Sequence, residues 1–250
     1  MRSCFFIVIL SSALFSCVLP GQAGERISLA TLDWAPYAGK DLPNLGFTSE
    51  IVTRAFEHAG YRVDIAFMPW ARVLRRVARG DADAMYPAYR STERARVFAL
   101  SDPFAQSFLV FYKRVDDDIA YTGLRNLEGY RIGVVRGYVN SPAFDQAEYL
   151  LKESTDSDES NLRKLLKGRI DLAVIDLYTA RHLLENRIPK GLVHLEPLEP
   201  PLEVKTLHLA VSRRLPGYRA VVADFNRALS RLSSDGTLEE IKTRQGIHAP

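Results

Sequence analysis

The stretch between Gly46 and Phe104 changes its spacing of apolar residues several times, which restricts the chain to a small group of folds. The pattern predicts a helix over 47–59, a strand over 61–68, a helix that begins at Pro69-Trp70, and a strand over 83–86. Gly60 and Gly80 follow the two helices. Glycine ends a helix well because it enters the left-handed region without a Cβ clash. Helices that alternate with strands indicate α/β units with largely parallel sheets.

The alternation continues over most of the remaining chain. Further strands are predicted over 27–33, 108–113, 131–135, 170–175 and 207–211. Further helices are predicted over 162–167, 177–185, 220–232 and 238–243, and another opens at Asn140-Ser141-Pro142, where Asn or Ser can cap a helix that starts with proline. From the residues alone, this arrangement fits either one doubly wound sheet or two smaller α/β domains.

Four short motifs follow one another between Gly60 and Phe104. They are Gly60-Tyr61 after a helix, Pro69-Trp70 at a helix start, Gly80-Asp81-Ala82-Asp83-Ala84, and Thr92-Glu93-Arg94 followed by Ser101-Asp102-Pro103-Phe104. In this order they resemble the first lobe of family 3 of the bacterial extracellular solute-binding proteins, which catch ligands for polar amino-acid ABC importers. The resemblance implies the two-lobed α/β periplasmic-binding-protein fold of type II. Each lobe would hold a mixed, mostly parallel sheet with flanking helices.

The resemblance also implies how the chain divides between the lobes. Lobe 1 is expected over 24–110 plus 207–250, and lobe 2 is expected as an insertion over 113–205. Two crossover strands would join the lobes. Charged or proline-rich stretches lie near both crossings, at 114–118 and 197–201.

Residues 1–23 have the composition of a secretory signal peptide. Arg2 is the positive residue, Phe5 to Leu19 form an apolar run, and Gly21-Gln22-Ala23 resembles a cleavage site. We therefore expect a periplasmic protein that begins near Gly24, which N-terminal sequencing of the periplasmic fraction would check. The alternatives are an uncleaved signal anchor and a lipoprotein acylated at Cys17. A diacylated Cys17 in the membrane fraction would contradict the prediction.

Composition excludes several classes of partner and site. The chain has 33 basic and 30 acidic residues, and loss of the leader removes only Arg2, so the net charge falls from +3 to +2. This balance argues against nucleic acid or an anionic membrane as partner. Cys4 and Cys17 are the only cysteines, and the five histidines lack metal-binding spacing, so we expect no metal and no cofactor.

Two charged residues are candidates for binding an amino acid, whose carboxylate and ammonium must both be paired when they leave water. Arg94 follows the strand over 83–86 and can hold a carboxylate with two parallel hydrogen bonds. The resemblance implies this role for it; the alternative is an exposed helical arginine. Asp176 ends the apolar strand over 170–175. The resemblance implies that it pairs the ligand ammonium, and the alternative is an N-cap of the following helix.

Bulky aromatic residues complete the predicted binding site. Trp34 and Trp70 are the only tryptophans, and the resemblance puts both at cleft-facing positions. Tyr86 and Tyr89 lie in a loop just before Arg94, where members of the family usually carry small hydroxyl residues. Tyr138 occupies a position where Ser or Thr is common. These departures from the family pattern predict a narrower site or a different ligand.

The sequence therefore predicts a periplasmic solute-binding protein that is not an enzyme. We expect a monomer that binds a carboxylate-bearing solute and docks on the membrane permease of an ABC transporter. One alternative is an enzyme like the cyclohexadienyl dehydratases, which resemble these binding proteins and eliminate water with an acid in the cleft; Asp176 or Glu93 would be that acid. Another is a ligand sensor that acts through a separate membrane partner.

Overall fold

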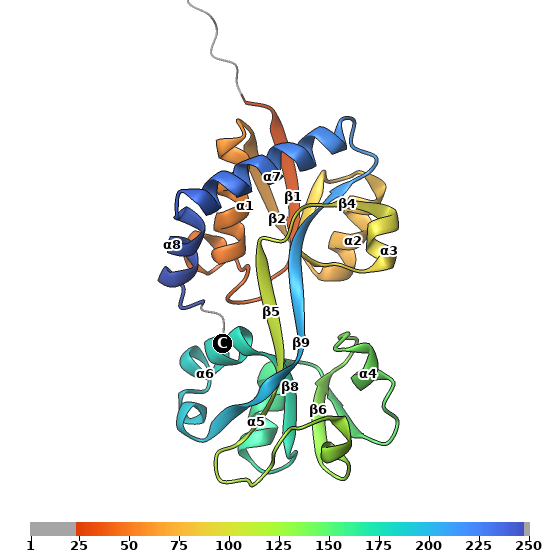
Figure 1. The fold of residues 1–250 in the computed structure, drawn as a ribbon, viewed down its shortest axis with the longest axis vertical. Coiled ribbons are helices and arrows are strands. Elements are labelled where there is room, and N and C mark those ends of the chain that lie inside the picture. Colours follow the sequence, from red (N-terminus) through yellow and green to blue (C-terminus); the bar gives the residue numbers. More distant parts are fainter. Residues whose placement is uncertain (1–23, 248–250) are drawn as a thin grey trace, which may run out of the picture.

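The computed structural model describes residues 24–247, which form two lobes connected by two long strands (Figure 1). The strands are β1 (Arg26–Thr31), β2 (Arg62–Phe67), β3 (Ala84–Tyr89), β4 (Phe98–Leu100), β5 (Ala105–Arg114), β6 (Arg131–Val135), β7 (Leu151–Thr155), β8 (Leu172–Asp176) and β9 (Leu195–Ser212). The α-helices are α1 (Phe47–His58), α2 (Trp70–Arg79), α3 (Thr92–Val97), α4 (Pro142–Asp145), α5 (Asp158–Leu166), α6 (Leu177–Asn186), α7 (Tyr218–Ser234) and α8 (Thr237–Arg244).

The first lobe is a sheet covered by helices on both faces. β1 lies between β2 and β3 and is parallel to both, while β9 returns antiparallel to β3. On one face, residues of α1, α7 and α8 such as Phe56, Phe225 and Ile241 form the larger core. On the other face, Val73 and Val77 of α2 pack in a smaller cluster with residues of β3 and β4. Both ends of the described chain are therefore needed to complete this lobe.

The second lobe repeats this layered arrangement within one continuous segment. β6 lies between β7 and β8 and is parallel to both, and β5 runs antiparallel to β8. Residues of α5 and α6, including Leu162, Leu165 and Leu184, form the core on one face. Phe144 of α4 packs on the other face with Phe111. Because β6, β7 and β8 are parallel, the residues that follow them meet at one edge of the sheet.

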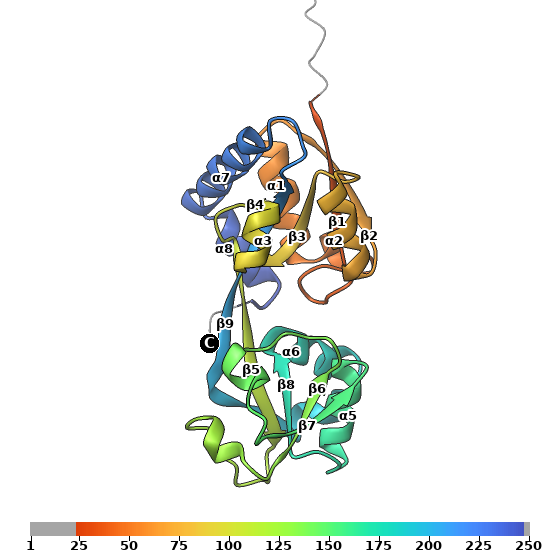
Figure 2. The same cartoon turned by 90° about the vertical axis from the view of Figure 1, so that its right-hand side faces the viewer.

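The two crossover strands are hydrogen-bonded to each other along most of their length. β5 and β9 pair antiparallel from Ala105–Leu207 to Arg114–Leu195, with an irregularity between Leu109 and Phe111. Seen from the side, these strands are the narrow part of the molecule (Figure 2). They also join both sheets into one path, in the order β2-β1-β3-β9-β5-β8-β6-β7.

The predicted two-lobed α/β fold with mixed sheets is confirmed. β6 spans the predicted residues 131–135, and α1 and α2 end just before Gly60 and Gly80 as expected. Two predictions need correction. Tyr86 to Tyr89 was expected in a loop, but β3 continues to Tyr89 through a bulge that accommodates Pro87. β9 begins 12 residues before the predicted strand and includes the proline-rich stretch over 197–201.

The predicted signal peptide lies outside the described residues. Within residues 24–247, none of the helices combines the length and the apolar character that crossing a bilayer requires.

Candidate functional site

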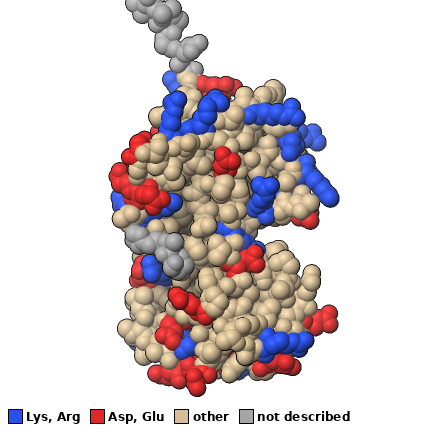
Figure 3. Space-filling view, in the orientation of Figure 1, with Lys and Arg blue, Asp and Glu red and all other residues tan. Residues whose placement is uncertain are grey.

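The space-filling view shows the molecule hollowed between the lobes (Figure 3). Aromatic side chains of the first lobe come together beside β5, where the Tyr37 hydroxyl donates to the carbonyl of Gln106 and the Tyr89 hydroxyl bonds Ser107. Trp34 follows β1 and stacks on Tyr37, with ring centroids 4.2 Å apart and planes inclined by 21°. The edge of Tyr89 approaches the same tryptophan at 5.8 Å. A two-way backbone pairing between Trp34 and Ala38 holds this turn. Trp34, Tyr37 and Tyr89 thus form an aromatic wall that belongs to the first lobe.

Arg94 lies beside this wall and is held by contacts within the first lobe. Ser91 caps α3 by accepting the backbone N–H of Arg94. The guanidinium donates to the carbonyl of Tyr89 at 2.8 Å and lies 5.3 Å from the ring centroid of Trp70. Burial lowers the pKa of Arg94, and its charge has no carboxylate partner among residues 24–247. A guanidinium has five N–H donors, so most of them stay available for a ligand.

Asp176 is in the predicted place but is already surrounded by donors. Its carboxylate accepts hydrogen bonds from the hydroxyls of Tyr37 (2.7 Å) and Ser107 (2.8 Å) and from the backbone N–H groups of Phe108 (3.2 Å) and Thr179 (2.9 Å). The last of these caps α6, as the alternative interpretation of the sequence required. Burial raises the pKa of Asp176, and these hydrogen bonds oppose the rise. In this conformation Asp176 connects β5, α6 and the Tyr37 turn, and it is 5% exposed.

The tyrosines predicted for the site fall into different environments. Tyr89 is partly buried and shares a 2.9 Å hydrogen bond with Ser107. Tyr138 follows β6 and is 55% exposed at the edge where the second lobe faces the cleft. Tyr86, by contrast, is fully buried in the core of the first lobe, where its hydroxyl bonds Ser49. A ligand contact for Tyr86 is therefore not supported, because its ring is fully enclosed among core residues of the first lobe.

Asp158 is a cleft-edge residue that the sequence analysis did not select. It begins α5 just after β7, so it shares a sheet edge with Tyr138 after β6 and with Asp176 at the end of β8. Burial, followed by the charge of Asp176, raises the pKa of Asp158 to about 7. Among the described residues its carboxylate has no hydrogen-bond or ion-pair partner. No local motif marks this residue, since its neighbours come from strands distant in sequence.

We expect Asp158→Asn to stabilise the protein at alkaline pH. Folding raises the pKa of this carboxyl, so the folded state resists its ionisation. The protein is therefore most stable below the unfolded pKa, where the carboxyl is protonated in both states, and that stability is lost as pH rises through about 7. The full shift corresponds to about 4 kcal/mol, and partial exposure should reduce it to about 2 kcal/mol. Urea unfolding of both proteins between about pH 5 and pH 8 measures this. Asp156→Asn, at an exposed acid two residues earlier, is the control. A stability difference that does not grow with pH would contradict the prediction.

Lys205 of β9 is the second residue that the sequence analysis missed. Its ammonium lies 4.9 Å from the ring centroid of Tyr89 and donates to the carbonyl of Val139 at 3.2 Å. The ammonium of Lys205 therefore contacts both the aromatic wall of the first lobe and the loop after β6 in the second lobe. Lys205 lies next to the predicted second crossover strand, but the residues beside it in the sequence form no motif that indicates a position in the cleft.

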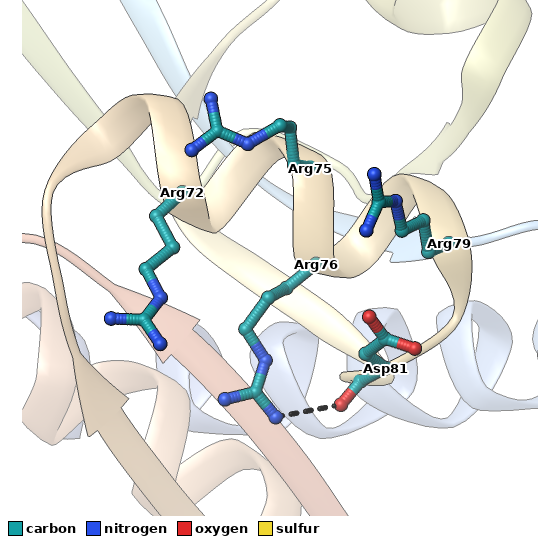
Figure 4. A pocket seen from close by; sticks show the side chains of 5 residues that line it. All are labelled: Arg72, Arg75, Arg76, Arg79 and Asp81. Atoms are coloured by element: carbon teal, nitrogen blue, oxygen red, sulfur yellow. Dashed lines mark hydrogen bonds between the residues drawn. The ribbon is translucent and has the colours of Figure 1, made fainter.

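The arginines of α2 form a separate feature. Arg72, Arg75, Arg76 and Arg79 surround an open hollow of about 400 Å³ together with Asp81 (Figure 4). Their side chains extend away from the helix, and Arg76 donates to the backbone carbonyl of Asp81 at 3.0 Å. The opposite face of α2 is buried through Val73 and Val77. These arginines therefore form the solvent-facing side of α2.

No group of three or more potential metal ligands occurs within the part of the chain that the structure describes. The histidine that is most buried, His208, bonds the carbonyl of Ser101 and the hydroxyl of Thr206. Burial lowers the pKa of His208 below its usual value. We assign it to the packing of β9 against the segment after β4.

Comparisons with known proteins agree with the two-lobed fold. The profile of the bacterial extracellular solute-binding proteins, family 3, matches residues 29–245. No curated protein sequence gives a match. Among solved structures, the fold is similar to a histidine kinase sensor domain resembling periplasmic binding proteins, with 22% identity, a TM-score of 0.74, and coverage of 89% of this chain and 96% of that one.

Two further structures come from streptococci. One belongs to a study of glutathione import via GshT and the cystine ABC importer TcyBC of Streptococcus mutans. It has 18% identity and a TM-score of 0.75 over 91% of this chain and 98% of that one. The other is the amino acid ABC transporter substrate-binding protein AbpA from Streptococcus pneumoniae bound to L-arginine, with 18% identity and a TM-score of 0.70 over 90% and 97%. At these identities the likeness shows the fold alone.

Proposed function

Because the chain belongs to family 3 of the bacterial extracellular solute-binding proteins, we propose that it captures a small carboxylate-bearing solute between its lobes for an ABC importer. An amino acid or a derivative is the class of ligand that we favour. We place the protein in the periplasm as a monomer that docks on a membrane permease. Arg94 carries this proposal, because its guanidinium is partly buried beside aromatic rings and lacks a carboxylate partner among the described residues.

The division of contacts between the lobes supports ligand-dependent closure. Arg94, Trp34 and Trp70 belong to the first lobe, whereas Tyr138 and Asp158 belong to the second. A ligand that touches both groups gains the second set of contacts only when the lobes approach each other. Such a ligand shifts the population toward the closed form, because it binds that form better.

Ligand recovery combined with solution scattering tests the proposal. Protein purified from a bacterial periplasm should retain a small carboxylate that a mass spectrum of the denatured sample identifies. Adding that compound back to stripped protein should reduce the radius of gyration, because the lobes close around it. Recovery of only neutral or cationic solutes, or binding without compaction, would contradict this function.

The dehydratase alternative gains a specific candidate from the structure. Of the acids suggested by the sequence, Asp176 already accepts four hydrogen bonds, and Glu93 is exposed with a lowered pKa that its backbone and Ser91 hydrogen bonds cause. Asp158 suits proton donation better, since its pKa lies near neutral pH. Release of phenylpyruvate from prephenate, lost in Asp158→Asn, would establish this activity. We favour the binding function because the family assignment supports it directly.

A further inference from the structure

Two cations, not one, converge on Tyr89 in the cleft. Arg94 donates to the backbone carbonyl of Tyr89, and the ammonium of Lys205 lies over the ring of the same tyrosine. One cation is carried by α3 and the other by β9, so different elements position them. The two charges influence each other: the pKa of Lys205 is lowered by burial, raised by Glu203 and Asp145, and lowered again by Arg94.

Neither cation forms an ion pair within the described part of the chain. Lys205 forms no ion pair there, and its one hydrogen bond goes to the neutral carbonyl of Val139. The guanidinium of Arg94 likewise bonds only the neutral carbonyl of Tyr89. Asp158, the unpaired carboxylate across the cleft, contacts neither of them in this conformation. A partly buried pair of like charges is unfavourable, and anions that pair with both of them would relieve that cost.

We propose that the ligand carries two anionic groups, with Arg94 binding one carboxylate and Lys205 binding the other. This inference rests on the proposed binding function and narrows its ligand class to dicarboxylates, including acidic amino acids. A ligand with a single carboxylate would leave one cation unpaired when closure excludes water. An ammonium has three N–H donors, so Lys205 can keep its bond to Val139 while it binds a carboxylate oxygen.

Lys205 could instead serve only to fasten the loop after β6 through Val139. The two roles predict different results for Lys205→Met, which keeps the apolar stem but removes the ammonium. A fastening role affects every ligand equally. An anion-binding role affects only ligands with the second carboxylate, so the ratio between matched ligands separates the two roles.

The experiment measures calorimetric affinities for three matched pairs of compounds. These are L-glutamate with L-glutamine, L-aspartate with L-asparagine, and succinate with succinamate, where each second member replaces a carboxylate by a neutral amide. Wild type, Lys205→Met and a control, Lys190→Met, are compared. Lys190 is exposed and has no ion pair or side-chain hydrogen bond within residues 24–247. Melting curves establish that each variant is folded.

We expect wild type to prefer the dicarboxylate of at least one pair by about 10- to 100-fold. Lys205→Met should reduce this ratio to below about threefold while the amide keeps its affinity, and Lys190→Met should leave the ratio unchanged. Equal affinity for both members of every bound pair would overturn the inference and leave the proposed function intact. Equal losses for both members in Lys205→Met would also overturn it. If no compound binds and no carboxylate co-purifies from the periplasm, the proposed function itself fails.

Discussion

Arg94→Ala should abolish measurable binding of a carboxylate ligand while the protein remains folded. The guanidinium of Arg94 lies against Trp70 and bonds the backbone of Tyr89 in the first lobe. It has no carboxylate partner among the described residues. Loss of a charge-assisted contact in a desolvated cleft costs about 2–5 kcal/mol, by analogy with buried pairs at protein interfaces. That corresponds to a loss in affinity between roughly 30-fold and several thousandfold. Calorimetry with the solute recovered from the periplasm measures this loss.

Arg96→Ala is the matched control for this experiment. Arg96 lies on the same short helix, is exposed, and forms no ion pair or side-chain hydrogen bond within residues 24–247. Its loss should change ligand affinity by less than about threefold, or roughly 0.7 kcal/mol. The unfolding free energy of Arg94→Ala should fall by about 1 kcal/mol, since one hydrogen bond to a backbone carbonyl is removed. Retention of binding within threefold in Arg94→Ala would assign Arg94 to the surface of the lobe.

Asp176→Ala should destabilise the protein by about 3 kcal/mol. The substitution removes an N-cap, worth about 1 kcal/mol, and leaves the N–H of Phe108 without its buried acceptor, at about 1–3 kcal/mol. Tyr37 and Ser107 lose a partner as well, although each has another one. Removing the buried carboxylate also removes the free-energy cost of burying its charge, which offsets part of this destabilisation. For a protein of this size, the melting temperature should fall by roughly 6–12 °C, which calorimetry measures.

Two further variants separate the contributions to this loss. Ser157→Ala removes the cap of α5 at a more open position and should cost about 1 kcal/mol. Tyr37→Phe removes only one of the donors to Asp176 and should also cost about 1 kcal/mol. If Asp176→Ala costs no more than Ser157→Ala, the network around Asp176 does not stabilise the fold, and an ammonium-binding role for Asp176 becomes the better explanation.

Features with local causes could be predicted from the sequence. α1 and α2 end at glycines with positive φ, and β6 is a short apolar strand between polar residues. Arg94 and Trp70 belong to motifs between Gly60 and Phe104, and Trp34 was selected through the family resemblance.

Features that depend on distant strands could not be predicted in this way. Tyr86 and Tyr89 differ by three positions, yet the bulge at Pro87 lets both pack against the larger core of the first lobe, and of the two only Tyr89 contacts Trp34. Asp158 reaches the cleft edge because β7, which precedes it, pairs with β6. Lys205 is a candidate because it lies over the ring of Tyr89, which is remote in sequence. The role of Asp176 was ambiguous for the same reason, since Tyr37 comes from the other lobe.

The path of the chain through the two lobes also has a consequence for the order of folding. The second lobe is built from one uninterrupted segment, so it can form as soon as that segment is available. The first lobe needs β9 beside β3 and α7 beside α1, and the ion pair between Glu50 and Arg244 joins residues from its two ends. Such non-local pairings form slowly because long loops must close first. We therefore expect the inserted lobe to acquire protease resistance before the lobe that encloses both ends of the chain.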